Sequence, residues 1–341
     1  MTYWFLCVRF RSIPPDRTQA TGAPQVKSIV KSRLVAGTAL ASLLALSACG
    51  AETAATADSA PEQTNITVEH AQGSTEVPVN PETVYTFDLG ALDTMDALDI
   101  DVDGVPAANF PESLSKYAGD DYAKIGSMKE PDFEAISEGA PDLIIISGRV
   151  AASYEELSKI APTIDLSVDQ TDSMASFKEV TGTLGRIFDK EDAADEKLAA
   201  IDKRIEETKT AAADAGTGLI VMTSGGEMTA YGAGSRFGII HDVLGVSPVA
   251  EIKADGKHGE SITAEYIADK NPDNLFVIDR DTAVGESGEA ALAVMDNELV
   301  NGTNAAKNDR ITALDASSWY LVGYGLSNVD SMVTEVQNGI S

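Results

Sequence analysis

The stretch Glu134–Arg149 reads EAISEGAPDLIIISGR, and the stretch Glu265–Arg280 reads EYIADKNPDNLFVIDR. Each has a Glu, a Pro-Asp pair seven and eight residues later, an apolar run, and an Arg seven residues after the Asp. This spacing predicts a short helix that ends at the Pro-Asp pair, followed by a buried parallel strand. Two copies 131 residues apart predict two similar αβ lobes that face each other. The alternative is two unrelated αβ units with surface arginines.

The arginines of these repeats are candidate ligand contacts. Arg149 and Arg280 follow their predicted strands, at the end where open α/β sheets bind ligands. Arg236 lies in the glycine-rich stretch Tyr231–Gly238, where glycine lets the backbone approach a ligand closely. Three guanidinium groups about 7 Å apart repel by ~2 kcal/mol per pair at an effective dielectric near 20, so a shared cleft needs an anionic ligand or nearby acids. The alternative is that each arginine pairs with an acidic residue near it in the sequence. Two Asp residues, for example, flank Arg280.

The N-terminal region has the pattern of an export signal. Residues 27–33 carry three basic side chains, Leu34–Leu46 is apolar, and the sequence LSAC ends at Cys49. This pattern predicts a signal with a lipoprotein cleavage site, after which Cys49 becomes the lipidated N-terminus. The apolar run is too short to span a bilayer as a helix. Residues 1–26 fit no part of the signal, and a mis-assigned start is the simplest explanation.

The rest of the chain divides into four segments. Residues 49–64 hold the lipidated Cys and a tether rich in Ala, Thr and acids. We predict an N-terminal lobe over 65–187, a connecting helix over 188–216 and a C-terminal lobe over 217–341. The predicted fold class is α/β, with two mostly parallel central sheets joined by one long rigid helix and a ligand cleft between the lobes. The alternative for the helix is an ordinary surface helix of one domain.

Short apolar and β-branched runs predict the strands, and helical spacing predicts the helices. The predicted elements are a hairpin over 66–70 and 76–78, strands over 84–88, 143–146, 163–166, 219–222, 275–278 and 311–314, and helices over 92–98, 190–215 and 329–336.

The chain is strongly acidic, with a net charge of −29 over 341 residues. Residues 1–48 hold six Lys or Arg and one Asp, so the remainder has 19 basic and 53 acidic residues and a net charge of −34. Such a surface repels nucleic acid and anionic lipid, so an anion site has to be local. Only six arginines follow Cys49. The other cysteine is Cys7, so the exported chain has no thiol for a disulfide, a zinc site or a nucleophile.

Two further side chains could bind ferric iron. His258 lies in a polar, glycine-bounded loop, and Tyr320 follows the last predicted strand. Imidazole and phenolate both bind ferric iron, although a lone loop His is more often simply solvated. His241 lies in an apolar helical run, so we expect it to be partly buried with its hydrogen bonds satisfied.

Enzyme signatures are absent from the sequence, which has no GxSxG, HExxH, P-loop or Rossmann glycine set. The two repeat glutamates, Glu134 and Glu265, could form an acid/base pair in a hydrolase, which requires both carboxylates in one cleft, roughly 5–10 Å apart. Their equivalent positions instead favour two docking points on one outer face.

Several long stretches resemble one known family, the lipid-anchored substrate-binding proteins of ABC iron importers. This is the helix-hinged class III of periplasmic binding proteins, and the chain is most similar to its catecholate-siderophore branch, which includes petrobactin binders. The resemblance covers about 66–336. The stretches that carry it are FDLGALDTMDAL (87–98), IGSMKEPDFEAI (125–136), PDLIIISGR (141–149), ELSKIAPTI (156–164), GAGSRFGIIHDVLG (232–245), NPDNLFVIDR (271–280), NELVNGTNAAKN (297–308) and SSWYLVG (317–323).

The resemblance implies roles for individual residues. An arginine trio contacts catecholate oxygens in this branch, and the matching residues are Arg149, Arg236 and Arg280. In some relatives a His and a Tyr complete an unsaturated iron shell, and these match His258 and Tyr320. One Glu per lobe docks on the permease, which matches the two repeat glutamates. The remaining ligand-binding predictions are the cleft residues Tyr231 and Trp319.

The expected function is capture of a ferric catecholate-type siderophore at the outer face of the cell membrane and its delivery to an ABC transporter permease dimer. We expect a lipid-anchored monomer without a resident cofactor, without enzymatic activity and without a nucleic-acid partner. Within the class, the alternative ligands are haem, cobalamin or another metal chelate. The alternatives of other classes are the secreted hydrolase and a structural surface lipoprotein.

Overall fold

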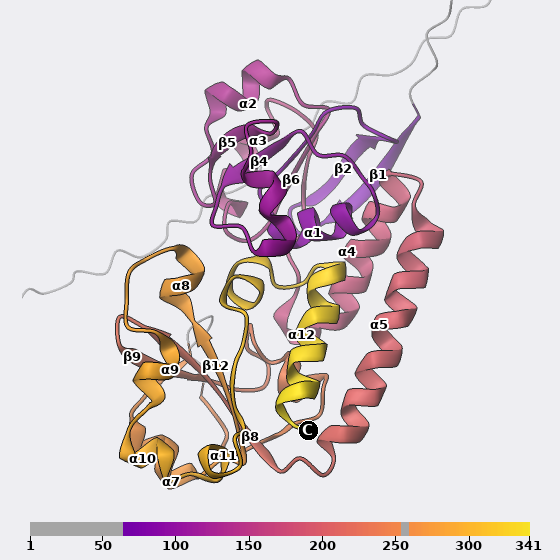
Figure 1. Ribbon diagram of the computed structural model, residues 1–341. Coiled ribbons are helices and arrows are strands. Elements are labelled where there is room, and N and C mark those ends of the chain that lie inside the picture. Colours follow the sequence, from indigo (N-terminus) through magenta and orange to yellow (C-terminus); the bar gives the residue numbers. More distant parts are fainter. Residues whose placement is uncertain (1–63, 254–258) are drawn as a thin grey trace, which may run out of the picture. The chain divides into compact units, whose positions relative to one another are not determined.

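The computed structural model describes residues 64–253 and 259–341. Cys49, most of the tether and His258 lie outside these ranges. The described residues belong to one compact unit, with a sheet in each half of its sequence (Figure 1). Within the part that the structure describes, no helix is long and apolar enough to cross a membrane.

The first sheet is entirely parallel and has the strand order β5-β4-β3-β6-β7. An antiparallel hairpin precedes it, as predicted. The strands are β1 (Asn65–His70), β2 (Gly73–Pro78), β3 (Val84–Thr86), β4 (Gly104–Ala107), β5 (Ala123–Ser127), β6 (Leu143–Ile146) and β7 (Thr163–Asp165).

The second sheet is mixed and has the order β11-β9-β8-β12-β13, with β10 paired to β8. Strands β8, β12 and β13 are parallel to one another. At one edge, β9 pairs antiparallel with both β8 and β11. The strands are β8 (Thr217–Ser224), β9 (Glu227–Tyr231), β10 (Ser247–Pro248), β11 (Glu260–Ile262), β12 (Asn274–Asp279) and β13 (Ile311–Ala313).

The sequence repeat folds into the same unit twice. Helices α2 (Phe133–Gly139) and α7 (Ala264–Lys270) both have seven residues and an N-cap side chain that accepts a hydrogen bond from the first turn. Both end in the left-handed conformation, with φ of 45° at Ala140 and 46° at Asn271. The Pro-Asp pair then leads into β6 or β12. The predicted helix and strand of each repeat are therefore confirmed.

The repeat Asp holds the neighbouring strand in register in both sheets. The Asp142 carboxylate accepts a hydrogen bond of 2.9 Å from the Thr83 amide, next to the start of β3. The Asp273 carboxylate accepts one of 2.8 Å from the Thr217 amide, at the start of β8. The spacing of Pro-Asp and apolar run that the two repeats share thus fixes the alignment of two parallel strands in each half, which places their carboxyl ends together.

Side chains of the repeat strands alternate between two cores, because successive side chains of a strand point to opposite faces. In β6, Leu143 and Ile145 join the largest core, and the two residues between and after them face a smaller one. The largest core contains side chains from both sheets, from α5 and from α12. One continuous apolar core therefore joins the two halves, and the predicted lobe boundaries at 187 and 216 stay an interpretation.

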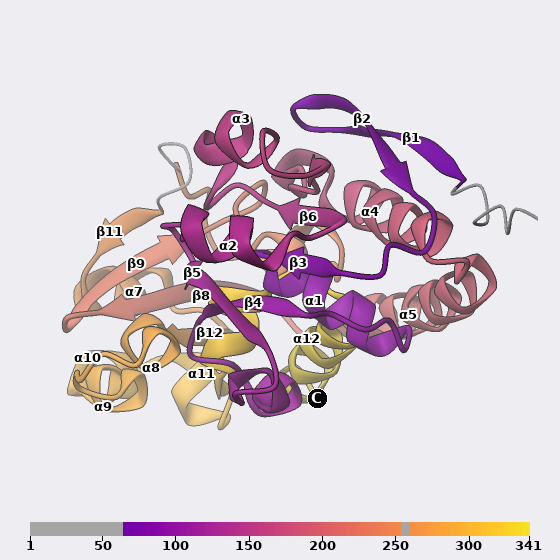
Figure 2. The same ribbon diagram turned by 90° about the horizontal axis from the view of Figure 1, so that it is seen from above.

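Three long helices pack together beside the sheets. Helix α5 (Glu191–Ala212) is the predicted long helix, and it contacts both α4 (Ser173–Ile187) and α12 (Leu326–Gly339) (Figures 1 and 2). Its buried residues follow a helical spacing, with a polar opposite face. The sequence analysis did not identify α4. The long helix is thus one member of a three-helix layer.

The C-terminal helix α12 is capped by the first half of the chain. The Asp93 carboxylate, on α1 (Leu89–Ala97), accepts hydrogen bonds from the amides of Ser327 (2.8 Å) and Asn328 (3.0 Å). A Cβ added at Gly325 would lie 2.6 Å from this carboxylate, so the close approach requires glycine. This contact fastens α12 to the N-terminal half.

The remaining helices are short and lie mostly in the loops between strands. They are α3 (Tyr154–Leu157), α6 (Ile239–Asp242), α8 (Arg280–Val284), α9 (Ala291–Met295), α10 (Glu298–Asn301), α11 (Asn304–Lys307), the 3₁₀ helices η1 (Glu112–Ala118), η2 (Ala151–Ser153) and η3 (Gln170–Asp172), and the π-helical turn η4 (Ser318–Val322).

Candidate functional site

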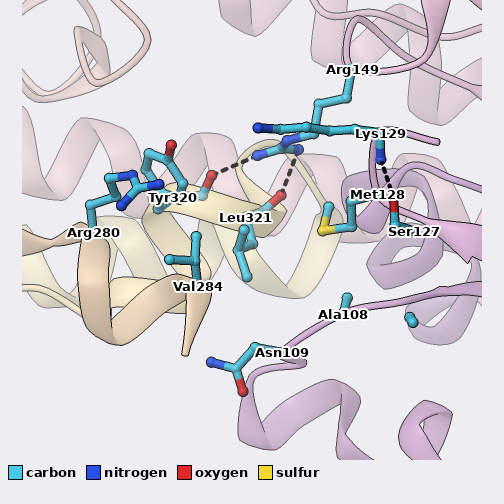
Figure 3. Close-up of a pocket in the computed structure, with 11 residues that line it drawn as sticks. Ala108, Asn109, Ser127, Met128, Lys129, Arg149, Arg280, Val284, Tyr320 and Leu321 are labelled. Atoms are coloured by element: carbon cyan, nitrogen blue, oxygen red, sulfur yellow. Dashed lines mark hydrogen bonds between the residues drawn. The ribbon is translucent and has the colours of Figure 1, made fainter. Parts of the chain in front are cut away.

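A cavity of about 440 Å³ lies where the loops of the two sheets meet. Figure 3 shows its lining, in which residues that follow β4, β5 and β6 face residues that follow β12 and β13. The lining residues are Ala107, Ala108, Asn109, Ser127, Met128, Lys129, Arg149, Arg280, Val284, Tyr320 and Leu321. All five strands are parallel within their sheets, so the cavity lies at the carboxyl ends of the strands, as the sequence predicts.

Two arginines from different halves meet on one backbone oxygen. Arg149 donates from Nη2 to the Tyr320 carbonyl oxygen at 2.8 Å and from Nη1 to the Leu321 carbonyl oxygen at 3.2 Å (Figure 3). Arg236 donates from Nη2 to the same Tyr320 oxygen at 2.7 Å. Neither guanidinium has a carboxylate within 4.0 Å in the part of the chain that the structure describes. The two cations are therefore held by neutral carbonyl dipoles.

The turn η4 makes these carbonyl groups available. Its hydrogen bond runs from the Gly323 amide to the Ser318 oxygen (2.9 Å), a span of five residues, and the chain then leaves the helix. Gly323 has φ 67° and ψ −121°, a conformation that side-chain-bearing residues rarely adopt. The carbonyl groups of Tyr320 and Leu321 are thus at a helix end, where they need outside donors. Arginines from elsewhere in the chain supply these donors.

Arg236 lies behind Tyr320 rather than in the cavity lining. Its guanidinium carbon is 4.5 Å from the centroid of the Tyr320 ring and 4.8 Å from that of Phe237, so both rings stack on the cation. Burial lowers the pKa of Arg236, and the charge of Arg149 lowers it further. The expected repulsion between cleft arginines is therefore present for this pair.

Arg280 lines the cavity and is paired with acids, which is the alternative that the sequence left open. Its Nη1 lies 3.1 Å from the Asp281 carboxylate and 2.8 Å from the Glu286 carboxylate. Glu286 first, and then the Tyr320 hydroxyl, raise the pKa of Arg280. The three arginines thus gather around one tyrosine, but only two of them lack an acidic partner.

A buried carboxyl group lies close to Arg149. Asp88 caps α1 by accepting from the Ala91 amide at 2.6 Å, and its other oxygen accepts from the Ser147 hydroxyl at 2.5 Å. Burial raises the pKa of Asp88, while its two hydrogen bonds and the charge of Arg149 oppose the rise. The Asp88 carboxyl group therefore holds the start of α1 against the loop that carries Arg149.

The structure adds cavity residues that the sequence analysis did not single out. Lys129 and Asn109 each lie two residues past the end of a strand, β5 and β4 respectively. Asn109 donates from Nδ2 to the Ala283 carbonyl oxygen at 2.9 Å, which joins the N-terminal half to α8. Both strands are short and contain Gly or Pro, so no clear alternation marked them. Lys129 lies in one of the stretches that carry the family resemblance.

Two predicted ligand contacts lie outside the cavity lining. Trp319 is only 2% exposed, and its Nε1 donates to the Glu335 carboxylate at 3.0 Å. Tyr231 is 3% exposed and packs edge-on against Phe237 with ring centroids 4.7 Å apart. Neither lines the cavity, because side chains adjacent to the site in sequence point into the core instead. Tyr320 does line the cavity, whereas His258 lies outside the described residues.

The repeat glutamates lie away from the cavity. Glu134 and Glu265 are exposed in the first turns of α2 and α7, and neither lines the cavity. Figure 1 shows these helices at opposite ends of the unit. The paired arrangement that a hydrolase requires is therefore not formed, and this alternative is wrong. His241 is partly buried and bonded to the Val246 carbonyl oxygen (2.7 Å), as expected.

A family model described as periplasmic binding protein matches residues 85–317. The chain is 45% identical to the petrobactin-binding protein YclQ of Bacillus subtilis strain 168 over 89% of this chain and 96% of the relative. It is 32% identical to the ferric-anguibactin-binding protein FatB of Vibrio anguillarum over 87% of this chain and 94% of the relative.

Solved structures give the same result for the fold. The crystal structure of YclQ superposes with a TM-score of 0.79 at 47% identity, covering 82% of this chain and 99% of that one. The periplasmic catecholate-siderophore-binding protein VctP of Vibrio cholerae gives a TM-score of 0.76 at 34% identity, covering 81% of this chain and all of that one. The predicted fold class, two αβ halves with a long helix, is confirmed.

Proposed function

Because the chain belongs to the periplasmic binding protein family, we propose that it captures a ferric siderophore with catecholate groups outside the cytoplasm and delivers it to the permease of an ABC importer. The relatives reported above are named as binding proteins, and none of them is named as an enzyme. The observation that carries the proposal is the meeting of Arg149 and Arg236 on the Tyr320 carbonyl, beside a cavity of about 440 Å³.

The charge of the site supports an anionic ligand. Arg149, Arg280 and Lys129 line the cavity of a protein with a net charge of −29, so its cations are local exceptions. A ferric tris-catecholate complex carries a charge of −3, which the three cationic side chains of the lining would oppose. Guanidinium groups suit catecholate oxygens because each offers several donors in a fixed plane. The names of the relatives YclQ and VctP support the same ligand class.

The alternative ligands of the class are haem, cobalamin and other metal chelates. Residues 64–253 and 259–341 contain no group of three or more His, Cys, Asp or Glu side chains that could hold a metal ion. A siderophore supplies the oxygen donors for its own iron, so it needs cations from the protein rather than a full set of metal ligands. Tyr320, and His258 beyond the described part, would add donors only to an incompletely coordinated ferric complex.

Fluorescence titration with a panel of chelates tests the proposal. Trp319 is the only Trp after Cys49, and it precedes Tyr320 of the cavity, so a coloured ferric complex should quench its emission through energy transfer without contact. We expect saturable quenching by ferric petrobactin and ferric enterobactin, and none by haem or cobalamin. Binding of haem or cobalamin with no response to the catecholates would refute the proposal.

Two partner contacts complete the proposed function. We propose that Glu134 and Glu265 dock on basic side chains of a permease dimer, one from each half of the binding protein, because they are exposed at matching positions of the repeat. We also propose that Cys49 carries the lipid that holds the protein, as a monomer, at the outer face of the cell membrane. One relative is named a probable siderophore-binding lipoprotein, which supports the anchor.

A further inference from the structure

Arg280 differs from the other two arginines because acids cancel its charge. Two carboxylates lie within 3.1 Å of its Nη1, those of Asp281 and Glu286. Arg149, on the opposite wall of the cavity, donates hydrogen bonds to two carbonyl oxygens and has no ion pair among the described residues. As the structure stands, Arg280 therefore offers little net positive charge to an anion, although its side chain lines the cavity.

Asp281 is a fixed partner of this arginine. Its side chain is 9% exposed and accepts from the Gly225 amide at 2.6 Å and from the Ser224 hydroxyl at 3.2 Å. These bonds tie the turn after β8 to the start of α8. A Cβ added at Gly288 would lie 2.7 Å from the Asp281 carboxylate, so the surrounding chain is closely packed. Asp281 cannot leave without breaking this network.

Glu286 has the opposite character. Its side chain is 59% exposed, and Arg280 is the one hydrogen-bond partner that its carboxylate has among the described residues. Its backbone is anchored, because the Glu286 amide donates to the Asp281 carbonyl oxygen at 2.8 Å and Gly285 ends α8 at φ 72°. The carboxylate can therefore swing away from a fixed backbone at low cost, since exposed ion pairs contribute only about 0.2–1 kcal/mol.

We propose that the Glu286 carboxylate occupies the place on Arg280 that an anionic oxygen of the ligand takes, and that it thereby sets how anionic a ligand must be to bind. A ligand oxygen with a strong negative charge displaces Glu286 and gains the guanidinium, whereas a neutral chelate does not. Glu286 is not among the lining residues, so it determines specificity through Arg280 rather than by lining the cavity itself. The proposal rests on the proposed function, because it presumes an anionic ligand at this site.

Glu286→Gln tests the proposal, because it keeps the shape of the side chain and removes its charge. With ferric enterobactin, a −3 complex that saturates its iron, we expect about two- to fivefold tighter binding, the equivalent of one exposed ion pair. A neutral ferric tris-hydroxamate should bind no worse to the variant than to the parent. The matched control is Glu289→Gln, an exposed acid of the same loop, which should leave both affinities unchanged. Thermal unfolding checks that both variants are folded.

A double-mutant cycle assigns the gain to Arg280. In the Arg280→Ala background, Glu286→Gln should no longer tighten binding, because the cation for which it competes is absent. Unchanged or weaker binding by Glu286→Gln alone, an equal gain from Glu289→Gln, or a gain that persists without Arg280 would each overturn the proposal while leaving the proposed function intact. If the parent binds no ferric siderophore, the proposed function fails, and this inference fails with it.

Discussion

At the scale of single residues, the carbonyl oxygen of Tyr320 organises the site. It accepts hydrogen bonds from Arg149 and Arg236, which are 171 and 84 residues away in the sequence. A carbonyl oxygen can receive two donors, and guanidinium groups retain further donors that point elsewhere. The arginines are therefore positioned before any ligand binds, which reduces the entropy that ligand binding has to overcome.

Arg149→Ala should weaken binding of a ferric catecholate by about 10- to 100-fold, because charge-assisted hydrogen bonds contribute ~1.5–3 kcal/mol. Arg149→Lys should restore part of this loss, since it keeps the charge and loses the planar fork. Fluorescence titration measures both affinities. The control is Arg186→Ala, an exposed arginine of α4 that bonds to Thr183. An equal loss in the control would show that the effect is not specific to the cleft.

At the scale of elements, two helix ends determine how the halves of the chain meet. The turn η4 (Ser318–Val322) ends with free carbonyl groups that take arginines from both halves. Helix α12 begins with free amides that take the carboxylate of Asp93 from α1. Both contacts satisfy the unpaired backbone groups that every helix end leaves. Besides the continuous apolar core, these helix ends thus connect the halves of the chain.

Gly323→Ala should disturb η4 and weaken ligand binding roughly tenfold, because a side chain at φ 67° and ψ −121° is strained and shifts the carbonyl groups that hold the arginines. The matched control is Gly73→Ala at the start of β2, where φ is 131° and a Cβ also meets nothing within 4 Å. Titration and thermal unfolding of both variants separate the two effects. Normal binding by Gly323→Ala would contradict the role assigned to η4.

The capping carboxylate of Asp93 should make stability depend on pH. Burial raises its pKa from 3.8 to about 6. The folded state therefore binds the proton more tightly than the unfolded state, so this group favours folding below pH 4 and loses that contribution as pH rises through 6. The loss is about 3 kcal/mol for a shift of this size.

Asp93→Asn removes this titration and keeps an oxygen that can accept from the two amides of α12. Its free energy of unfolding should exceed that of the parent at pH 7, by up to about 3 kcal/mol, and should approach the parent value at pH 4. Denaturant unfolding at the two pH values measures the difference. The exposed Asp101→Asn serves as the control. A variant that is equally destabilised at both pH values would show that the charge itself is required for the cap.

At the scale of the whole molecule, the functions are separated in space. The cavity lies between the two sheets, and the matching helices α2 and α7 lie at opposite ends of the unit (Figure 1). Ligand binding and transfer to a permease can therefore be impaired independently. The acidic surface suits a partner with basic pockets, because complementary charge speeds and orients association.

Replacing Glu134 and Glu265 together with Ala should abolish siderophore-dependent iron uptake and leave binding in solution unchanged. The control is the pair Glu138→Ala and Asp269→Ala, exposed acids on the same two helices. Uptake of radioactive iron by cells and titration of the purified protein measure the two properties. A loss of binding in solution would place these glutamates at the ligand and refute the docking proposal.

Cys49→Ala should release the protein into the medium or leave the signal uncleaved, because this Cys is the proposed site of lipidation. Fractionation of cells and immunoblotting measure the distribution. Cys7→Ala, upstream of the proposed cleavage point, should behave as the parent. Normal membrane retention of Cys49→Ala at the size of the processed parent protein would refute the anchor.

The sequence by itself determined the features that depend on neighbours within a few residues. The repeat helices that end at the Pro-Asp pairs, the apolar strands β6 and β12, and the helical periodicity of α5 all appear where the pattern predicts them. These features are local because helix caps, turns and strand alternation are set by residues in contact along the chain. The same reasoning placed Arg149 and Arg280 at strand ends that line a shared cavity.

Only the tertiary structure decided which partners the side chains at the cavity and the helix ends contact. Asp93 contacts Ser327, which lies 234 residues later in the sequence, and no local sequence pattern predicts this partner. The same is true of the burial of Trp319, which precedes Tyr320 of the cavity lining, and of the pairing of Arg280 with Glu286. Pairing across such distances depends on how apolar cores and helix ends fit together in three dimensions, and the linear pattern of residue types does not contain that fit.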